Sequence, residues 1–149
     1  MYTDNRVKNL IASRFVPVRV HVRENAAEWK TLSSKFGVQW TPTILIVDTD
    51  GDEKHRIEGF LPTEDFLSQV ELGLAHAAFN RGDYTTAERL FREVPGKYPD
   101  TDAAPEALYW AGVAKYRATD DPAALKETSA EVSARYAGSS WAKKASVWQ

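Results

Sequence analysis

The stretch from Trp40 to Gly51 constrains the fold of this chain more than any other. Trp40-Thr41-Pro42-Thr43 leads into the apolar run Ile44-Leu45-Ile46-Val47, which is followed by Asp48-Thr49-Asp50-Gly51. Because proline cannot donate to a sheet ladder, Pro42 belongs at the first residue of a strand or at a sheet edge. The run is continuous rather than alternating, which is typical of a strand covered on both faces. The stretch predicts a buried strand that begins at a rigid X-Pro bond, trans or cis, and ends at a turn.

Three elements are expected before this strand. Helical spacing of apolar residues predicts a helix over 5–12, with Thr3 or Asp4 as its cap. Valines alternate with other residues over 15–22, which predicts a strand. A second helix is expected over 26–36, where Asn25 is a candidate cap and Gly37 a natural left-handed stop.

After the opening strand, the turn at Asp48–Asp52 predicts a hairpin, with Glu53–Phe60 returning as an antiparallel strand. Thr63 can cap the next helix, Thr63–Arg81. The remaining pattern is helical throughout. Helices are expected over 83–94 (ended or kinked by Pro95-Gly96), from 102–105 to about 119, from 122 to about 137, and from 139 or 140 through 148.

Composition excludes several classes of function. The 149 residues carry a net charge of −2, and acidic and basic side chains are balanced in both halves, so nucleic acid is not an expected partner. The chain has no cysteine, which excludes disulfides, thiolate metal sites and dithiol redox chemistry by these residues. The three histidines lie in different elements, so no metal site is expected, and no cofactor is indicated.

The first residues contain no basic region leading into an apolar run, and no stretch is apolar enough for a spanning helix. We therefore expect a soluble, cytoplasmic chain with no membrane partner, although a lost N-terminus would hide a signal peptide.

The second half of the chain repeats itself. Ala75 aligns with Gly112, and Ala87 with Ala124, in each case 37 residues further on. A repeat of helical pairs at this period predicts stacked hairpins, each of which buries its face against the next. Small residues at the matched positions allow the helices to approach closely.

Residues 1–80 resemble part of a thioredoxin-like domain. The resemblance rests on Phe15-Val16-Pro17-Val18, on Phe36-Gly37-Val38-Gln39-Trp40-Thr41-Pro42-Thr43, and on Gly59-Phe60 with the helix that follows. It implies that the Thr41–Pro42 bond is cis. It also implies that Trp40, Thr41 and Pro42 form an edge that pairs with an extended substrate peptide. Trp40 is expected either to stack on that peptide or to fill space inside the domain.

The chain departs from this family at its start. The family places a central strand and a Cys-x-x-Cys motif before the point where this chain begins. We therefore expect an incomplete α/β thioredoxin-like fold without its central strand. Three arrangements can satisfy the unpaired strand edges: a longer natural chain, an edge supplied by a second copy or another protein, or direct pairing of the flanking strands.

Residues 64–149 resemble tetratricopeptide repeats, an all-α helical-repeat fold. The matching positions are small, turn, aromatic and proline residues: Ala75, Gly82, Tyr84, Ala87, Phe91, Pro99, and in part again Gly112, Tyr116 and Ala124. Such repeats imply peptide binding through a shallow concave groove. The positions that would face it are Leu72, His76, Phe79, Tyr109, Val113 and Tyr116.

Together these patterns predict a truncated thioredoxin-like domain over 1–80, joined through the helix 64–81 to helical repeats over 64–149. The predicted function is redox-inactive, non-catalytic binding of a protein or peptide. The alternative is a shortened form of a thioredoxin-like thiol–disulfide oxidoreductase whose Cys-x-x-Cys lies upstream of Met1. A third possibility is assembly, with an exposed sheet edge pairing two copies.

Overall fold

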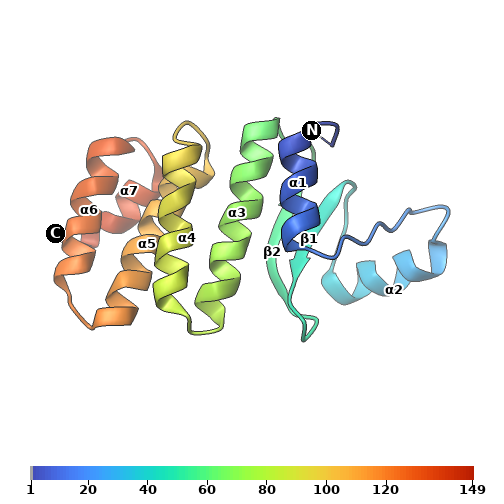
Figure 1. The fold of residues 1–149 in the computed structure, drawn as a ribbon, viewed down its shortest axis with the longest axis horizontal. Coiled ribbons are helices and arrows are strands. Elements are labelled where there is room, and N and C mark those ends of the chain that lie inside the picture. Colours follow the sequence, from blue (N-terminus) through green and yellow to red (C-terminus); the bar gives the residue numbers. More distant parts are fainter. Residues whose placement is uncertain (1) are drawn as a thin grey trace.

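In the computed structural model, which describes residues 2–149, a stack of helices extends away from one small sheet (Figure 1). The chain order is α1 (Asn5–Arg14), α2 (Ala26–Phe36), β1 (Thr43–Val47), β2 (Glu53–Glu58), α3 (Thr63–Asn80), α4 (Tyr84–Lys97), α5 (Ala103–Thr119), α6 (Ala123–Arg135), α7 (Ser140–Ala145) and a short 3-10 helix, η1 (Ser146–Trp148). The α/β part therefore occupies one end of the molecule, and every element after Thr63 is helical.

The predicted hairpin is present. β1 and β2 pair antiparallel, with Thr43 opposite Glu58 and Ile44 opposite Ile57. At the turn, the Asp48 amide donates to the Asp52 carbonyl over 3.0 Å. The Asp48 carboxylate accepts from the Asp52 amide over 2.9 Å, so an Asx-type contact closes the loop as the sequence indicates.

The strand predicted over 15–22 is wrong. This segment lies outside every helix and strand, and the sheet in residues 2–149 consists of β1 and β2 alone. The side chains of Val16 and Val18 are 92% and 81% exposed. A strand is defined by the ladder it forms, and here the alternating valines have no neighbouring strand. The segment 15–22 therefore does not pair directly with β1, which excludes one of the three arrangements considered for the unpaired strand edges.

Most helix boundaries follow the expected caps. The Asp4 carboxylate accepts from the Arg6 amide over 2.8 Å at the start of α1. Gly37 ends α2 in the left-handed region, at φ 62°. The hydroxyl of Ser139 accepts from the Ala142 amide at the start of α7. The side chains of Asp4 and Ser139 each satisfy a terminal amide that has no partner inside the helix, and the Gly37 amide donates to the Ser33 carbonyl.

Two of the predicted caps differ in detail. Thr63 is the first residue of α3 rather than its cap, and Pro62 occupies the capping position. Asn25 precedes α2 but makes no side-chain capping bond to the helix. Its carboxamide oxygen instead accepts from the His21 amide over 2.9 Å, which fixes the chain that enters α2.

α4 continues through Pro95 to Lys97, so the prediction that this helix ends at Pro95-Gly96 is wrong, and the alternative of a kink there stays a prediction. Pro95 lies in the last turn of α4, where its missing amide costs a single bond, to the carbonyl of Phe91. The ring is buried among neighbouring helices, and this packing favours a continuous helix up to Lys97.

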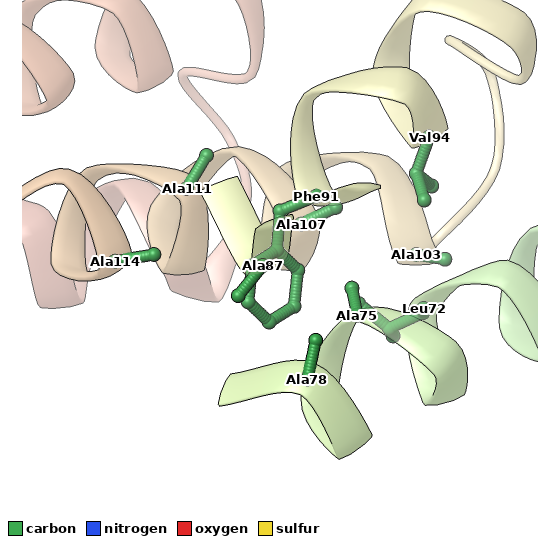
Figure 2. Close-up of a cluster of buried hydrophobic side chains, with 10 residues drawn as sticks. All are labelled: Leu72, Ala75, Ala78, Ala87, Phe91, Val94, Ala103, Ala107, Ala111 and Ala114. Atoms are coloured by element: carbon green, nitrogen blue, oxygen red, sulfur yellow. The ribbon is translucent and has the colours of Figure 1, made fainter. Parts of the chain in front are cut away.

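Apolar side chains gather in separate clusters along the molecule. The cluster beside the sheet consists of Val7, Ile46, Ile57, Phe66, Leu67 and Val70. The largest cluster lies where α3, α4 and α5 meet, and Phe91 of α4 points between the other two helices (Figure 2). Its remaining members are mostly alanines, which let the three helices pack closely. A third cluster joins α5 to α6 and α7 around Leu108 and Val132.

Candidate functional site

The turn that leads into β1 is held by defined backbone contacts. The Thr41–Pro42 peptide bond is cis. The Pro42 carbonyl accepts from the Gly59 amide over 2.8 Å, which extends the hairpin pairing by one step beyond Thr43. The Thr43 hydroxyl donates to the Trp40 carbonyl over 2.7 Å. These bonds fix the path of residues 40–43 at one end of the sheet.

Two large aromatic side chains are exposed at this end. Trp40 is 70% exposed and Phe60 is 75% exposed. The backbone bond between Pro42 and Gly59 brings their chain segments together, since Trp40 lies two residues before Pro42 and Phe60 directly follows Gly59. Trp40 therefore does not fill space inside the domain. Exposed tryptophan and other aromatic residues are typical of protein interfaces.

Phe60 is not among the predicted site residues, because the sequence pattern places it within the return strand Glu53–Phe60. The strand β2 ends at Glu58, and Gly59 follows with φ at 83°. This left-handed glycine turns the chain before Phe60. The Gly-Phe pair immediately after the strand was the available signal.

The backbone next to Pro42 is open. The amides of Trp40 and Thr41 donate no hydrogen bond within residues 2–149. Within residues 2–149, β1 pairs with β2 on one side and has no strand on the other. An edge of this kind can accept an extended peptide through main-chain hydrogen bonds.

Not all of the six residues predicted to line the repeat groove are accessible to a peptide. Leu72 does not face a groove: it is fully buried in the cluster between α3 and α4. Its position was assigned from the repeat resemblance, but hydrophobicity favours the interior over an open helix face. The prediction that Leu72 contacts a bound peptide is therefore wrong.

His76 and Phe79 of α3 are brought together around Trp110 of α5. The ring centroids of His76 and Trp110 are 5.3 Å apart, and those of Phe79 and Trp110 are 5.4 Å apart. Both rings also contact Phe91 edge-on. These two predicted groove residues are half-buried, and they mainly hold α3, α4 and α5 together.

The three predicted groove residues of α5 lie further along the stack. Tyr109 stacks on Trp148 with centroids 4.5 Å apart and also contacts Trp141. Val113 and Tyr116 are half-buried on the same helix. The structure therefore places the five remaining groove residues on α3 and α5, although His76, Phe79 and Tyr109 belong to aromatic clusters.

Two histidines meet where the sheet packs on α3. His55 of β2 and His76 of α3 stack with ring centroids 6.2 Å apart. His55 Nε2 bonds to Gln69 Oε1 over 2.8 Å, and His76 Nε2 lies 3.5 Å from Glu106 Oε1. Burial lowers the pKa of the His55 imidazole below its ordinary value. Among residues 2–149, no group of three or more His, Cys, Asp or Glu side chains is placed to hold a metal ion.

Comparison with known proteins bears on the first half of the chain. Residues 1–73 match the family model of a thioredoxin-like domain. Over these residues the chain is similar to a thioredoxin-like domain. The matched residues contain the two-stranded sheet, and the rest of the described chain is helical.

Curated relatives match over a similar length. The thiol:disulfide interchange protein DsbD of Yersinia pestis strain Pestoides F is 33% identical over 72 residues, as is the DsbD protein of Yersinia pestis biovar Antiqua strain Antiqua. The match covers 47% of this chain but only 12% of each relative. No solved structure matches the chain. No helix within residues 2–149 is both long and apolar enough to cross a membrane.

Proposed function

We propose that this chain is a non-catalytic binding module that holds an extended peptide at the edge formed by Trp40, Thr41 and Pro42, with Phe60 beside it. The observation that carries the proposal is the exposure of two large aromatic side chains, 70% for Trp40 and 75% for Phe60, at one ordered end of the sheet. The chain contains no thiol to react with a substrate, so recognition is the function that these residues support.

The two aromatic rings and the open backbone have different tasks in this proposal. The free amides of Trp40 and Thr41 donate to carbonyls of the bound peptide, as in strand addition at a sheet edge. The rings of Trp40 and Phe60 cover apolar side chains of the peptide and remove their own apolar surface from water.

The test uses a peptide selected from a random phage library on the immobilised chain, and its affinity is then measured by fluorescence anisotropy. Trp40→Ala is expected to weaken binding by about tenfold or more, the loss typical of an interface hot spot. Val147→Ala is the control, because Val147 is 78% exposed and belongs to η1, next to the C-terminus, which lies at the far end of the molecule from the sheet (Figure 1). Equal affinity of wild type and Trp40→Ala for every selected peptide would rule out this site.

We infer in addition that the helices from α3 onward are tetratricopeptide-like repeats. Consecutive helices pack on one another, α3 on α4, α4 on α5 and α5 on α6. The matched small residues Ala75, Gly112, Ala87 and Ala124 are all buried. These features support a second peptide surface at His76, Phe79, Tyr109, Val113 and Tyr116. Val113→Glu would abolish binding of a peptide held there and leave one held at Trp40 unaffected.

A second candidate function is a role in thiol–disulfide exchange. The likeness to proteins named thiol:disulfide interchange protein favours it. In this proposal the 149-residue chain is part of a longer thioredoxin-like oxidoreductase whose Cys-x-x-Cys lies upstream of Met1. Sequencing the gene upstream of Met1 decides between the two candidates: an in-frame strand followed by Cys-x-x-Cys supports the enzyme, and a stop codon directly before Met1 excludes it. The 149-residue chain alone should not turn over disulfides in an insulin reduction assay.

Assembly of two copies through the free edge of β1 is a third proposal, supported by the two-stranded sheet. Light scattering tests it, since a monodisperse monomer at all concentrations would exclude a stable dimer. A cytoplasmic location, with neither nucleic acid nor membrane as partner, stays a prediction.

A further inference from the structure

Arg56 connects the strand β2 to the end of α2. Side chains of alternate strand residues point to opposite faces of a sheet. The Cβ of His55 lies close to Gly73 of α3, and Ile57 belongs to the cluster beside the sheet, so both point to the α3 face. Arg56 lies between them and points to the other face, where its guanidinium donates to the carbonyl of Phe36, the last residue of α2. Figure 1 shows α2 and α3 on opposite sides of the hairpin.

Two glutamates hold the Arg56 guanidinium in place. Its Nε donates to Glu53 Oε1 over 2.8 Å and its Nη2 to Glu53 Oε2 over 2.7 Å, while its Nη1 lies 3.4 Å from Glu58 Oε1. The paired bonds to Glu53 are the bidentate geometry in which arginine and carboxylate interact most strongly. The side chain of Arg56 is 27% exposed, so it is not a freely moving surface charge. The guanidinium is therefore a fixed donor for the Phe36 carbonyl.

This bond is made where the chain leaves α2. The last carbonyls of a helix have no partner inside the helix, and Arg56 supplies one for Phe36. The Val38 amide donates back to the Ser33 carbonyl over 2.9 Å, which keeps the next residues close to the helix end. Trp40 follows only two residues later. Arg56 thereby fixes the start of the loop formed by residues 37–42.

The far end of this loop is held by the same hairpin. The Thr43 hydroxyl donates to the Trp40 carbonyl over 2.7 Å, and the Gly59 amide donates to the Pro42 carbonyl over 2.8 Å. Gly59 directly follows β2, and Arg56 lies three residues before it. One short segment of the chain therefore provides an anchor for each end of the loop.

We propose that Arg56 is a positioning residue for peptide binding at the edge formed by Trp40, Thr41 and Pro42, an inference that rests on the function proposed above. Its role is indirect: it holds the loop in the geometry that binds, so that less order is lost when the peptide arrives. Without the guanidinium the loop samples other paths. The apparent affinity then falls with the fraction of chains that have the binding geometry.

The first test measures the affinity of the full chain for a selected peptide by fluorescence anisotropy. Arg56→Met keeps an unbranched apolar stem but removes the guanidinium, and should weaken binding by about fivefold, the effect of one lost hydrogen bond. Arg56→Lys should recover about half of this loss, since an ammonium can donate to the Phe36 carbonyl but cannot bind Glu53 bidentately. Arg89→Met is the matched control, because Arg89 pairs with Glu93 over 2.7 Å on α4, and should leave the affinity unchanged.

The second test measures the order of the loop without any peptide. The heteronuclear NOE of a backbone amide falls when that amide becomes mobile on the picosecond to nanosecond timescale. In Arg56→Met the NOE should fall for the amides of residues 37–41 and stay unchanged for the amides of α5. Arg56→Lys should restore it in part. A residue that only stabilised the whole fold would leave the NOE of this loop unchanged while the chain stays folded.

The outcomes separate this inference from the function on which it rests. Weaker binding together with a lower NOE in the loop, both partly restored by lysine, supports the role of Arg56. If Trp40→Ala weakens binding but Arg56→Met changes neither affinity nor NOE, the role of Arg56 is overturned and the binding site stands. Weaker binding with an unchanged NOE would also overturn it, because Arg56 would then contact the peptide itself. If Trp40→Ala has no effect on any selected peptide, the binding function fails and the role of Arg56 in it fails too.

Discussion

The helical end of the molecule buries its large apolar side chains, whereas the end that contains the sheet exposes several of them. Beyond Thr63, large residues such as Phe66, Leu72 and Phe91 are fully buried. Before Thr63, several apolar side chains, among them Val16, Trp40 and Phe60, are exposed to water. A helix satisfies its own backbone and needs only one neighbour to cover its apolar face, whereas a strand needs a neighbour for its backbone and cover for its side chains. The helical end therefore buries its largest apolar side chains within the described chain, whereas the sheet end leaves several of them exposed.

The largest loss of stability is expected when a buried side chain of the helical end is truncated. Phe91→Ala removes a fully buried ring from the cluster shared by α3, α4 and α5, and should lower the free energy of unfolding by about 3–5 kcal/mol. Urea denaturation followed by circular dichroism measures this value. A loss below about 1 kcal/mol would mean that the cluster is looser than its complete burial indicates.

The joint between the two ends gives the next largest effect. A Cβ at Gly73 would lie 2.9 Å from the Cβ of His55 and would press on Ile46 as well. Gly73→Ala should therefore destabilise the protein by about 1–3 kcal/mol through overpacking. Gly96→Ala is the matched control, because no atom lies within 4 Å of its added Cβ. This control should be neutral or more stable by up to about 1 kcal/mol, since alanine favours the helix.

The histidine pair at the same joint predicts a dependence on pH. Burial lowers the pKa of His55, and the nearby His76 lowers it further, whereas the bond to Gln69 and the carboxylates of Glu106 and Glu53 oppose this shift. The unfolded chain therefore takes up a proton at a higher pH than the folded one. The stability contributed by neutral His55 is present above the ordinary pKa of 6.5 and is lost as the pH falls from there towards the folded value.

Urea denaturation at pH 7.5 and pH 5.0 measures this loss. His55→Gln should show a smaller difference between the two pH values than wild type. Trp40→Ala should retain the wild-type difference, since it changes no titratable group. An unchanged pH dependence in His55→Gln would show that acid sensitivity arises elsewhere.

The smallest effects are expected from the large residues of the sheet end that face water. Phe60→Ala and Val16→Ala should each change the free energy of unfolding by no more than about 0.5 kcal/mol, because neither side chain is covered in the fold. Thermal and urea denaturation of both variants, run beside Phe91→Ala, measure the contrast directly. A loss above about 2 kcal/mol from either would mean that the side chain packs against another copy in solution.

The helices could be predicted well because their signals are local. Asp4, Gly37 and Ser139 mark helix ends through bonds to residues only a few positions away. The hairpin of β1 and β2 could also be predicted, since the Asp48 turn joins two adjacent strands. In each case the residues that decide the structure lie within one short window of the sequence.

The errors arose where the outcome depends on distant residues. The valines of 15–22 have the pattern of a strand, but a strand needs a neighbour that no local pattern supplies. Leu72 was assigned to a groove by its place in a repeat, whereas packing of α3 on α4 buries it. For Phe60 and Trp40, the local sequence gave the residue type but not the exposure, which only the assembled sheet determines.

The position of α3 limits where the chain can be divided to make a chimeric protein. α3 contributes Phe66, Leu67 and Val70 to the cluster beside the sheet, and Leu72, Ala75 and Ala78 to the cluster of the helical stack. The thioredoxin-like match ends at residue 73, inside this helix rather than in a flexible linker. A recombinant exchange of either end must therefore carry all of α3, because a junction within it would remove the α3 residues from one of the two clusters.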